Sequence, residues 1–127
     1  MKLRLQSNSI RLRLKRGEVA QLAKTGCIEE KIVMGSEPND IFHYVLESSH
    51  AVSKVEAHLR DRGVLVQVPV ETVIRWAEGD DVGIEAGLPV GDQGNLQVMI
   101  EKDFACLDGT DEQNADTFPN PQAGTKC

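Results

Sequence analysis

Aromatic side chains are scarce in this sequence of 127 residues: one Trp, one Tyr and three Phe make up 4% of it. Aliphatic residues must therefore fill most of the interior, and a hydrophobic content of 40% is enough for one core. Proteins that stack nucleic-acid bases need exposed aromatic rings. Their scarcity, together with a pI near 5.0, disfavours nucleic acid as a partner.

Cysteines and long apolar runs are also few. Cys27, Cys106 and Cys127 are widely spaced and odd in number, so we expect free thiols and no disulfide framework. The densest apolar run, Val64 to Val70, is far too short to cross a bilayer. Met1 to Leu5 lacks the continuous apolar stretch of an export signal. These absences predict a cytoplasmic location and no membrane partner.

Motifs that would state a reaction are missing as well. The sequence has no glycine-rich phosphate loop, no dinucleotide fingerprint and no Gly-x-Ser-x-Gly elbow. His43, His50 and His58 do not have the spacing of zinc ligands, and no Cys-x-x-Cys completes such a site. The sequence therefore predicts no cofactor, and it leaves open both the oligomeric state and whether the chain is an enzyme.

Charge is plentiful but unevenly distributed. The net charge is −6, yet residues 1–16 carry six basic residues and no acidic one. Residues 63–127 carry three basic and twelve acidic residues. This asymmetry predicts that the two ends of the chain attract each other, or that each attracts a different partner.

Alternating apolar residues predict β-strands along most of the chain. Leu3 and Leu5 alternate with polar residues, and after a short turn Ile10, Leu12 and Leu14 alternate with arginines, which predicts a hairpin with one apolar and one cationic face. Extended patterns of the same kind cover the ranges 27–34, 40–47, 53–60, 64–68 and 96–104. A shorter pattern covers 82–86, and Gly87 to Gly94 is loop-like. From these eight candidate ranges we predict six or seven strands.

Two short helices interrupt the strands. The first covers Arg16 to Lys24 and ends at Gly26. The second begins near Pro69 and carries an apolar stripe of Val70, Val73, Ile74 and Ala77. Trp76 lies off this stripe, so we expect it to cover the edge of the core.

The pattern predicts an α+β fold built on a mostly antiparallel meander sheet, either open or curled into a half-barrel. Residues 1–107 form the predicted domain, and residues 108–127 form an extended acidic tail with Phe118 as its apolar anchor. No internal repeat is apparent beyond the two hairpins.

Several segments resemble a small family of uncharacterised bacterial proteins. They are Asn8 to Leu14, Lys24 to Gly26, Glu101 to Leu107 and Asp116 to Pro121. The resemblance implies a bacterial protein of the cytosolic type and no known activity. That family often has a threonine cap before its first helix, whereas Lys15 stands here and cannot accept helix N–H groups.

A second resemblance concerns charged strands. Arg11 to Arg13 and Ile28 to Lys31 resemble strands of the triphosphate-tunnel enzymes, but the opening Glu-x-Glu-x-Lys signature of those enzymes is absent. This resemblance is an analogy of fold only.

The predicted cationic face of the first hairpin is the leading candidate site. Lys2, Arg4, Arg11 and Arg13 fall on one side of adjacent strands, where arginines bind phosphate or carboxylate in bidentate geometry. The alternative is a solvated outer face whose edge charges prevent aggregation.

Two carboxylates form the second candidate site. Glu101 and Asp103 project from the same side of one strand, at a spacing that suits a divalent metal such as Mg²⁺. Surface charge on a half-exposed strand explains them as well. The acids from Asp108 onward do not fit a calcium loop, and a solvated tail explains them better.

Two functions remain open from the sequence. The first is a non-catalytic binding protein that holds an anionic small molecule, or an acidic protein surface, on its basic hairpin, with the acidic tail lying across that surface or engaging another partner. The second is a metal-dependent enzyme that acts on a phosphorylated small molecule.

Overall fold

The computed structural model describes residues 1–104 and 116–119. The predicted α+β class and the two helices are confirmed, but the described residues contain eight strands. In chain order the elements are β1 (Lys2–Gln6), β2 (Ser9–Leu14), α1 (Arg16–Thr25), β3 (Cys27–Val33), β4 (Ile41–Ser49), β5 (Glu56–Arg60), β6 (Gly63–Pro69), α2 (Val70–Glu78), β7 (Gly83–Pro89), the 3₁₀ turn η1 (Gly91–Gln93) and β8 (Asn95–Lys102).

The strands form two mixed four-stranded sheets, so the predicted meander and half-barrel are wrong. One sheet has the order β1-β2-β8-β7 and the other β3-β4-β6-β5. Each sheet joins two antiparallel hairpins through a parallel central pair, β2 with β8 and β4 with β6. Neither sheet closes on itself within the described part of the chain. Parallel pairs join segments that are distant in sequence, which hydrophobic periodicity does not reveal.

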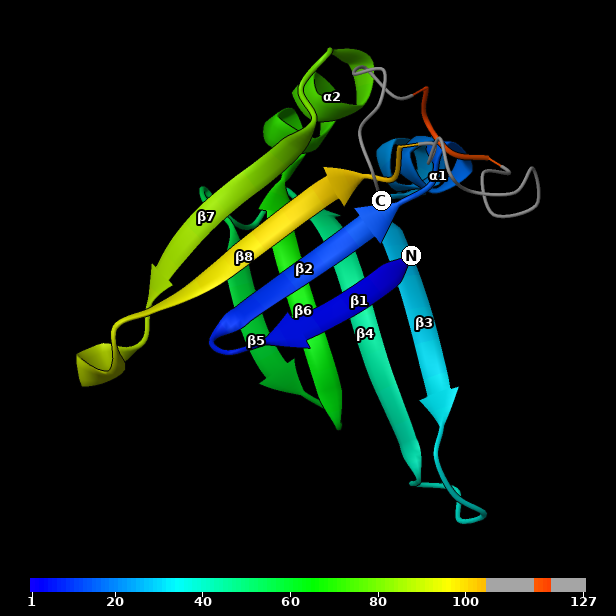
Figure 1. Cartoon of the computed structure of the whole chain (residues 1–127), viewed down its shortest axis with the longest axis vertical. Helices are drawn as coiled ribbons and strands as arrows, with labels where there is room; N and C mark the ends of the chain where they lie inside the picture. The colour runs from blue at the N-terminus through cyan, green and yellow to red at the C-terminus, as the bar shows by residue number, and fades with distance from the viewer. Residues whose placement is uncertain (105–115, 120–127) are drawn as a thin grey trace.

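The two sheets form two layers that cross one another, and both helices lie at one end of them (Figure 1). The core lies between the layers. Leu12, Leu14 and Ile100 come from one sheet, and Leu46 and Val66 come from the other. Each of these five side chains is at most 1% exposed. No helix in the described ranges has the length and apolar composition needed to cross a bilayer.

The fold is an internal repeat of hairpin, helix, hairpin. β1-β2-α1-β3-β4 is the first repeat, and β5-β6-α2-β7-β8 is the second. Exchanging the two repeats turns the strand order β1-β2-β8-β7 into β5-β6-β4-β3, which is the other sheet. Of this structural repeat, only the two hairpins were recognised from the sequence.

Strand register obeys the same relationship. Ile10 and Leu12 pair with Val98 and Ile100 in one sheet. Their counterparts in the other sheet are the pairs Val64–Tyr44 and Val66–Leu46. Matched positions mostly share apolar character rather than residue identity, which is why the repeat escapes notice in the sequence.

The helices bury matching positions. α1 buries Val19 and Leu22, and α2 buries Val73 and Trp76. Trp76 is only 1% exposed and donates a hydrogen bond from Nε1 to the carbonyl of Val82 at 3.2 Å, so it fills the core instead of covering its edge. Ile74, predicted to be inward, is 41% exposed.

β7 was only partly predicted. It runs to Pro89 and so includes residues that were interpreted as a loop. Ile84, Ala86 and Leu88 pack against the core. Gly87, which lies between Ala86 and Leu88, conceals this alternation because it supplies no side chain to the outer face.

Candidate functional site

The four predicted cations do share one face. β1 and β2 pair so that Lys2 lies opposite Arg13 and Arg4 lies opposite Arg11. The opposite face of β2 carries Ile10, Leu12 and Leu14, which are buried in the core. We call Lys2, Arg4, Arg11 and Arg13 the cationic face. β1 and β2 belong to the front sheet in Figure 1, and the cationic face lies on the side of these strands opposite the core.

The two predicted carboxylates lie on this same face, because β8 runs parallel to β2 and places Glu101 beside Arg13. The Glu101 Oε1 atom is 2.9 Å from Arg11 Nε and 3.9 Å from Arg13 Nε. Asp103 Oδ2 is 3.2 Å from Lys2 Nζ. The structure therefore joins both candidate sites into one charged surface.

These ion pairs differ in exposure. The side chains of Arg11 and Glu101 are 29% and 25% exposed, and that of Asp103 is 8% exposed. Arg11 Nε and Glu101 Oε1 are buried atoms that approach closely without the alignment of a hydrogen bond, so their contact is electrostatic. Arg11 Nη2 also contacts Met99 Sδ at 3.8 Å. Glu101 thus holds the Arg11 side chain in place from one side.

Arg4 stands apart, since none of the described carboxylates lies within ion-pair distance of it. Its neighbour directly across the strand pair is Arg11, and like charges in that position destabilise a sheet. Two carboxylates contact three of the four cations. Glu85 faces the same side but lies on β7, two strands from β2. The cationic face therefore keeps an excess of positive charge around Arg4.

The second repeat shows which side chains this strand pair needs in order to fold, apart from any role in binding. The counterparts of Lys2, Arg4, Arg11 and Arg13 are Glu56, His58, Leu65 and Gln67, which occupy the same registers on β5 and β6. Glu47, the counterpart of Glu101, accepts a hydrogen bond from Gln67 Nε2 at 3.0 Å. The fold thus builds the same pair of strands without Arg or Lys at these positions, so the four cations are not a requirement of the architecture.

Metal ligands do not gather in the described residues. No group of three or more His, Cys, Asp or Glu side chains there is placed to hold a metal ion. His43 Nδ1 is 3.6 Å from Glu29, and His58 Nε2 is 3.1 Å from Glu56, so these two histidines lie on the outer face of the other sheet. Glu101 and Asp103 are the nearest approach to a metal pair, and both already contact cations.

Phe118 packs against the body of the domain. Its N–H donates to the carbonyl of Asp103 at 2.8 Å, and its ring meets Phe104 edge-on at 6.0 Å. Arg16 and Lys102 approach the ring centre at 5.7 and 5.5 Å. Lys102 itself is buried and donates to the carbonyl of Gly79 at 2.9 Å. Phe118, which was predicted to anchor the tail, lies beside α1.

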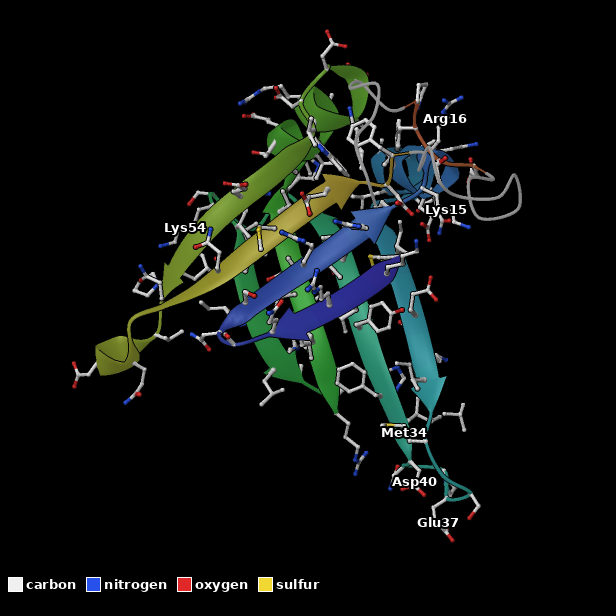
Figure 2. All side chains as sticks on the ribbon, viewed as in Figure 1. Lys15, Arg16, Met34, Glu37, Asp40 and Lys54 are labelled. Atoms are coloured by element: carbon white, nitrogen blue, oxygen red, sulfur yellow. The ribbon has the colours of Figure 1, made fainter. Side chains whose placement is uncertain are left out.

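Asp116 is a contact that the sequence analysis missed. Its carbonyl accepts from the Arg16 N–H at 2.9 Å, and its carboxylate accepts from the Gly17 N–H at 3.2 Å. Asp116 thereby supplies the helix cap that Lys15 lacks. Figure 2 shows Lys15 and Arg16 at the start of α1, beside the segment 116–119. Residues 105–115 and 120–127, which include the rest of the predicted tail, lie outside the described residues.

A small hollow on the other sheet was also missed. It measures about 270 Å³ and is lined by His43, Arg60, Glu29 and Asp61, with apolar Val45, Val64 and Leu65. Gly63 lies in the same transverse row as His43 and Arg60 and contributes no side chain. The row therefore has a gap between the imidazole and the guanidinium. Gly63, which directly precedes the β-prone run 64–68, was the only sequence signal for it.

Among the described residues, Cys27 and Tyr44 have pKa values raised above their ordinary values. Burial, reinforced by Glu47 and Glu29, raises the pKa of the Cys27 thiol. Burial also raises the pKa of Tyr44, with smaller effects from Glu30 and Glu18. Neither residue belongs to the cationic face. A raised pKa makes Cys27 a poor nucleophile near neutral pH, because the thiolate is the reactive form.

Comparison with known proteins gives a family but no activity. A family of unknown function, DUF7009, matches residues 1–122. The chain belongs to this family. No curated protein and no solved structure matches it. The function must therefore be inferred from the geometry.

Proposed function

We propose that this protein binds small anions that carry phosphate or carboxylate groups, and that the cationic face is the binding site. The observation that carries the proposal is Arg4, which faces Arg11 across the strand pair and has no carboxylate within ion-pair distance among the described residues. An anion seated between these guanidiniums would relieve their repulsion and accept bidentate hydrogen bonds.

The comparison between repeats supports this reading. A solvated strand face needs some polar or charged side chains to stay soluble, and in the second repeat Glu56, His58 and Gln67 satisfy that need beside the apolar Leu65. Three arginines on two adjacent strands exceed it. Glu101 supports the site by orienting Arg11, at 2.9 Å, without neutralising Arg4. The site is open to solvent, and its two described carboxylates already contact cations, which favours binding over catalysis.

Calorimetric titration with pyrophosphate tests the proposal. We expect Arg4→Gln to weaken binding about tenfold, which corresponds to about 1.4 kcal/mol. The same substitution should leave the free energy of unfolding unchanged or raise it, because it removes a like-charge pair. Lower affinity without lower stability identifies a residue kept for binding.

Arg75→Gln is the matched control, because Arg75 is an exposed arginine on α2, away from the cationic face. It removes the same charge and should leave the affinity unchanged. If Arg4→Gln and Arg75→Gln lower the affinity for pyrophosphate equally, the loss results from net charge alone and not from the cationic face. If the unaltered protein does not bind pyrophosphate, the proposal is refuted.

A metal-dependent enzyme for phosphorylated small molecules is the second candidate. One observation favours it: Glu101 and Asp103 share the face with the arginines. Mg²⁺ bound there would have to displace Lys2 and Arg11 from these carboxylates. If this function holds, Mg²⁺ should raise the affinity for pyrophosphate and support its hydrolysis, and Glu101→Gln should abolish both effects. Binding that Mg²⁺ leaves unchanged favours the first candidate.

A further inference from the structure

β3 is an open edge of its sheet. It pairs with β4 on one side only, and Figure 1 shows no strand beyond it. The end of this edge is apolar and exposed: Ile32 is 45% exposed, Val33 72% and Met34 74%. Met34 projects at the end of the strand in Figure 2. Exposed apolar edge strands offer unpaired backbone groups to another chain.

β3 carries three charged residues, Glu29, Glu30 and Lys31, but it is longer than β1 and β5 and lacks the proline of β7. β1 carries Lys2 and Arg4, and β5 has only five residues and ends at Arg60. β7 is the counterpart of β3 in the second repeat, and it has Pro89 where β3 has Val33. Proline on an edge strand cannot donate to a further strand. The same architecture is therefore blocked at β7 and open at β3.

We propose that β3 pairs with β3 of a second copy of this chain, antiparallel and with the two-fold axis at Glu30. All seven residues of Cys27–Val33 then overlap. Glu29 lies opposite the partner's Lys31, Ile28 opposite the partner's Ile32, and Cys27 opposite the partner's Val33. These pairs join opposite charges and cover the exposed Ile32 and Val33 side chains. The two rear sheets become one continuous eight-stranded sheet.

Backbone direction agrees with this register. The Met34 N–H donates to the carbonyl of Asp40 at 2.7 Å, which directs Met34 toward the β4 side. Alternation along the strand then directs the backbone groups of Val33, Lys31 and Glu29 outward. The proposed register sets these outward residues opposite one another, so their N–H and C=O groups can form the new ladder.

One residue pair in this register is unfavourable, and it gives a prediction that holds for this register and not for others. Glu30 faces its own copy at the axis, where like charges oppose pairing even though each Glu30 carboxylate also contacts the Met1 ammonium of its own chain at 3.2 Å. Glu30→Gln should therefore strengthen the dimer. Lys31→Glu should weaken it about tenfold or more, because both Glu29 contacts become repulsive. The charge-swapped double variant Glu29→Lys, Lys31→Glu should restore it.

Sedimentation velocity across a range of protein concentrations measures these effects. Lys24→Glu is the matched control: it reverses the same charge on the exposed side of α1 and should leave the dimer unchanged. Val33→Pro, which copies Pro89, should give a monomer. A protein that is monomeric at every concentration overturns the proposal. A double variant that dimerises as weakly as Lys31→Glu alone also overturns it, because that result shows that residues 29 and 31 do not lie opposite one another across the interface.

Disulfide trapping tests the register independently. In a background with Cys106 and Cys127 changed to Ser, Val33→Cys should form a covalent dimer through Cys27 of the partner subunit under mild oxidation. The two positions lie at opposite ends of one strand, so they cannot bond within one chain. Val82→Cys, another exposed position, should stay monomeric. A monomeric Val33→Cys protein, or equal crosslinking of both variants, contradicts the proposed register.

Discussion

Individual side chains near the start of α1 show how distant residues complete a local structure. Lys15 cannot cap the helix, which made its onset doubtful from the sequence. The Lys15 N–H is held by the Glu18 carboxylate at 2.9 Å, and the next two N–H groups are held by Asp116. A side chain built on Gly17 would come within 2.8 Å of the Asp116 carboxylate, so glycine permits the approach. No local pattern reveals a cap that arrives from the far end of the chain.

Replacing Asp116 tests this capping role. Asp116→Ala should lower the free energy of unfolding by about 1 kcal/mol, the usual value of a side-chain cap. Urea denaturation measures the loss. Asp80→Ala removes an exposed aspartate that has no such contact and should change stability by less than about 0.5 kcal/mol. Equal effects of the two substitutions would show that Asp116 does not cap α1.

At the scale of the elements, the local sequence pattern predicted most strands and both helices, but it did not predict which distant strands pair. The alternation of apolar and polar residues at Leu3, Leu5 and Ile10 to Leu14 located the first hairpin, because a strand with one buried face has an apolar residue at every second position. The parallel pairs β2–β8 and β4–β6 were not predicted, since each depends on partners that lie far apart in the chain. The shared face of the arginines could be predicted from one hairpin. The presence of Glu101 and Asp103 beside them required the β2–β8 pairing.

The contact between β4 and β6 offers a test at this scale. A Cβ atom on Gly63 would lie 1.8 Å from the His43 carbonyl oxygen, so the strands can approach only at glycine. Gly63→Ala should therefore lower the free energy of unfolding by more than about 2 kcal/mol. Gly87→Ala is the control, because its nearest neighbour is 3.6 Å away. Thermal or urea unfolding of both variants checks the difference, and a small loss at Gly63 would contradict the close approach.

At the scale of the whole molecule, the repeat separates what the fold requires from what one half adds. Both halves share hairpins, helices and register, yet the outer hairpin face of the first carries four cations, whereas that of the second carries Arg60 with His58 and Glu56. The sequence revealed the charge asymmetry and attributed its balance to the acidic tail. Among the described residues, Glu101 and Asp103, on and beside β8, contact the hairpin. Most of the acidic tail lies outside the described ranges.

The most direct test of anion binding is a heteronuclear NMR titration of the protein with pyrophosphate. We expect the largest shifts at the side chains of Arg4, Arg11 and Arg13 and at the amides of β1 and β2. The matching positions His58, Leu65 and Gln67 on β5 and β6 should stay unchanged, which makes the second repeat an internal control. Shifts of equal size in both repeats, shifts confined to other surfaces, or no shift at saturating pyrophosphate would contradict the assignment of the cationic face as the binding site.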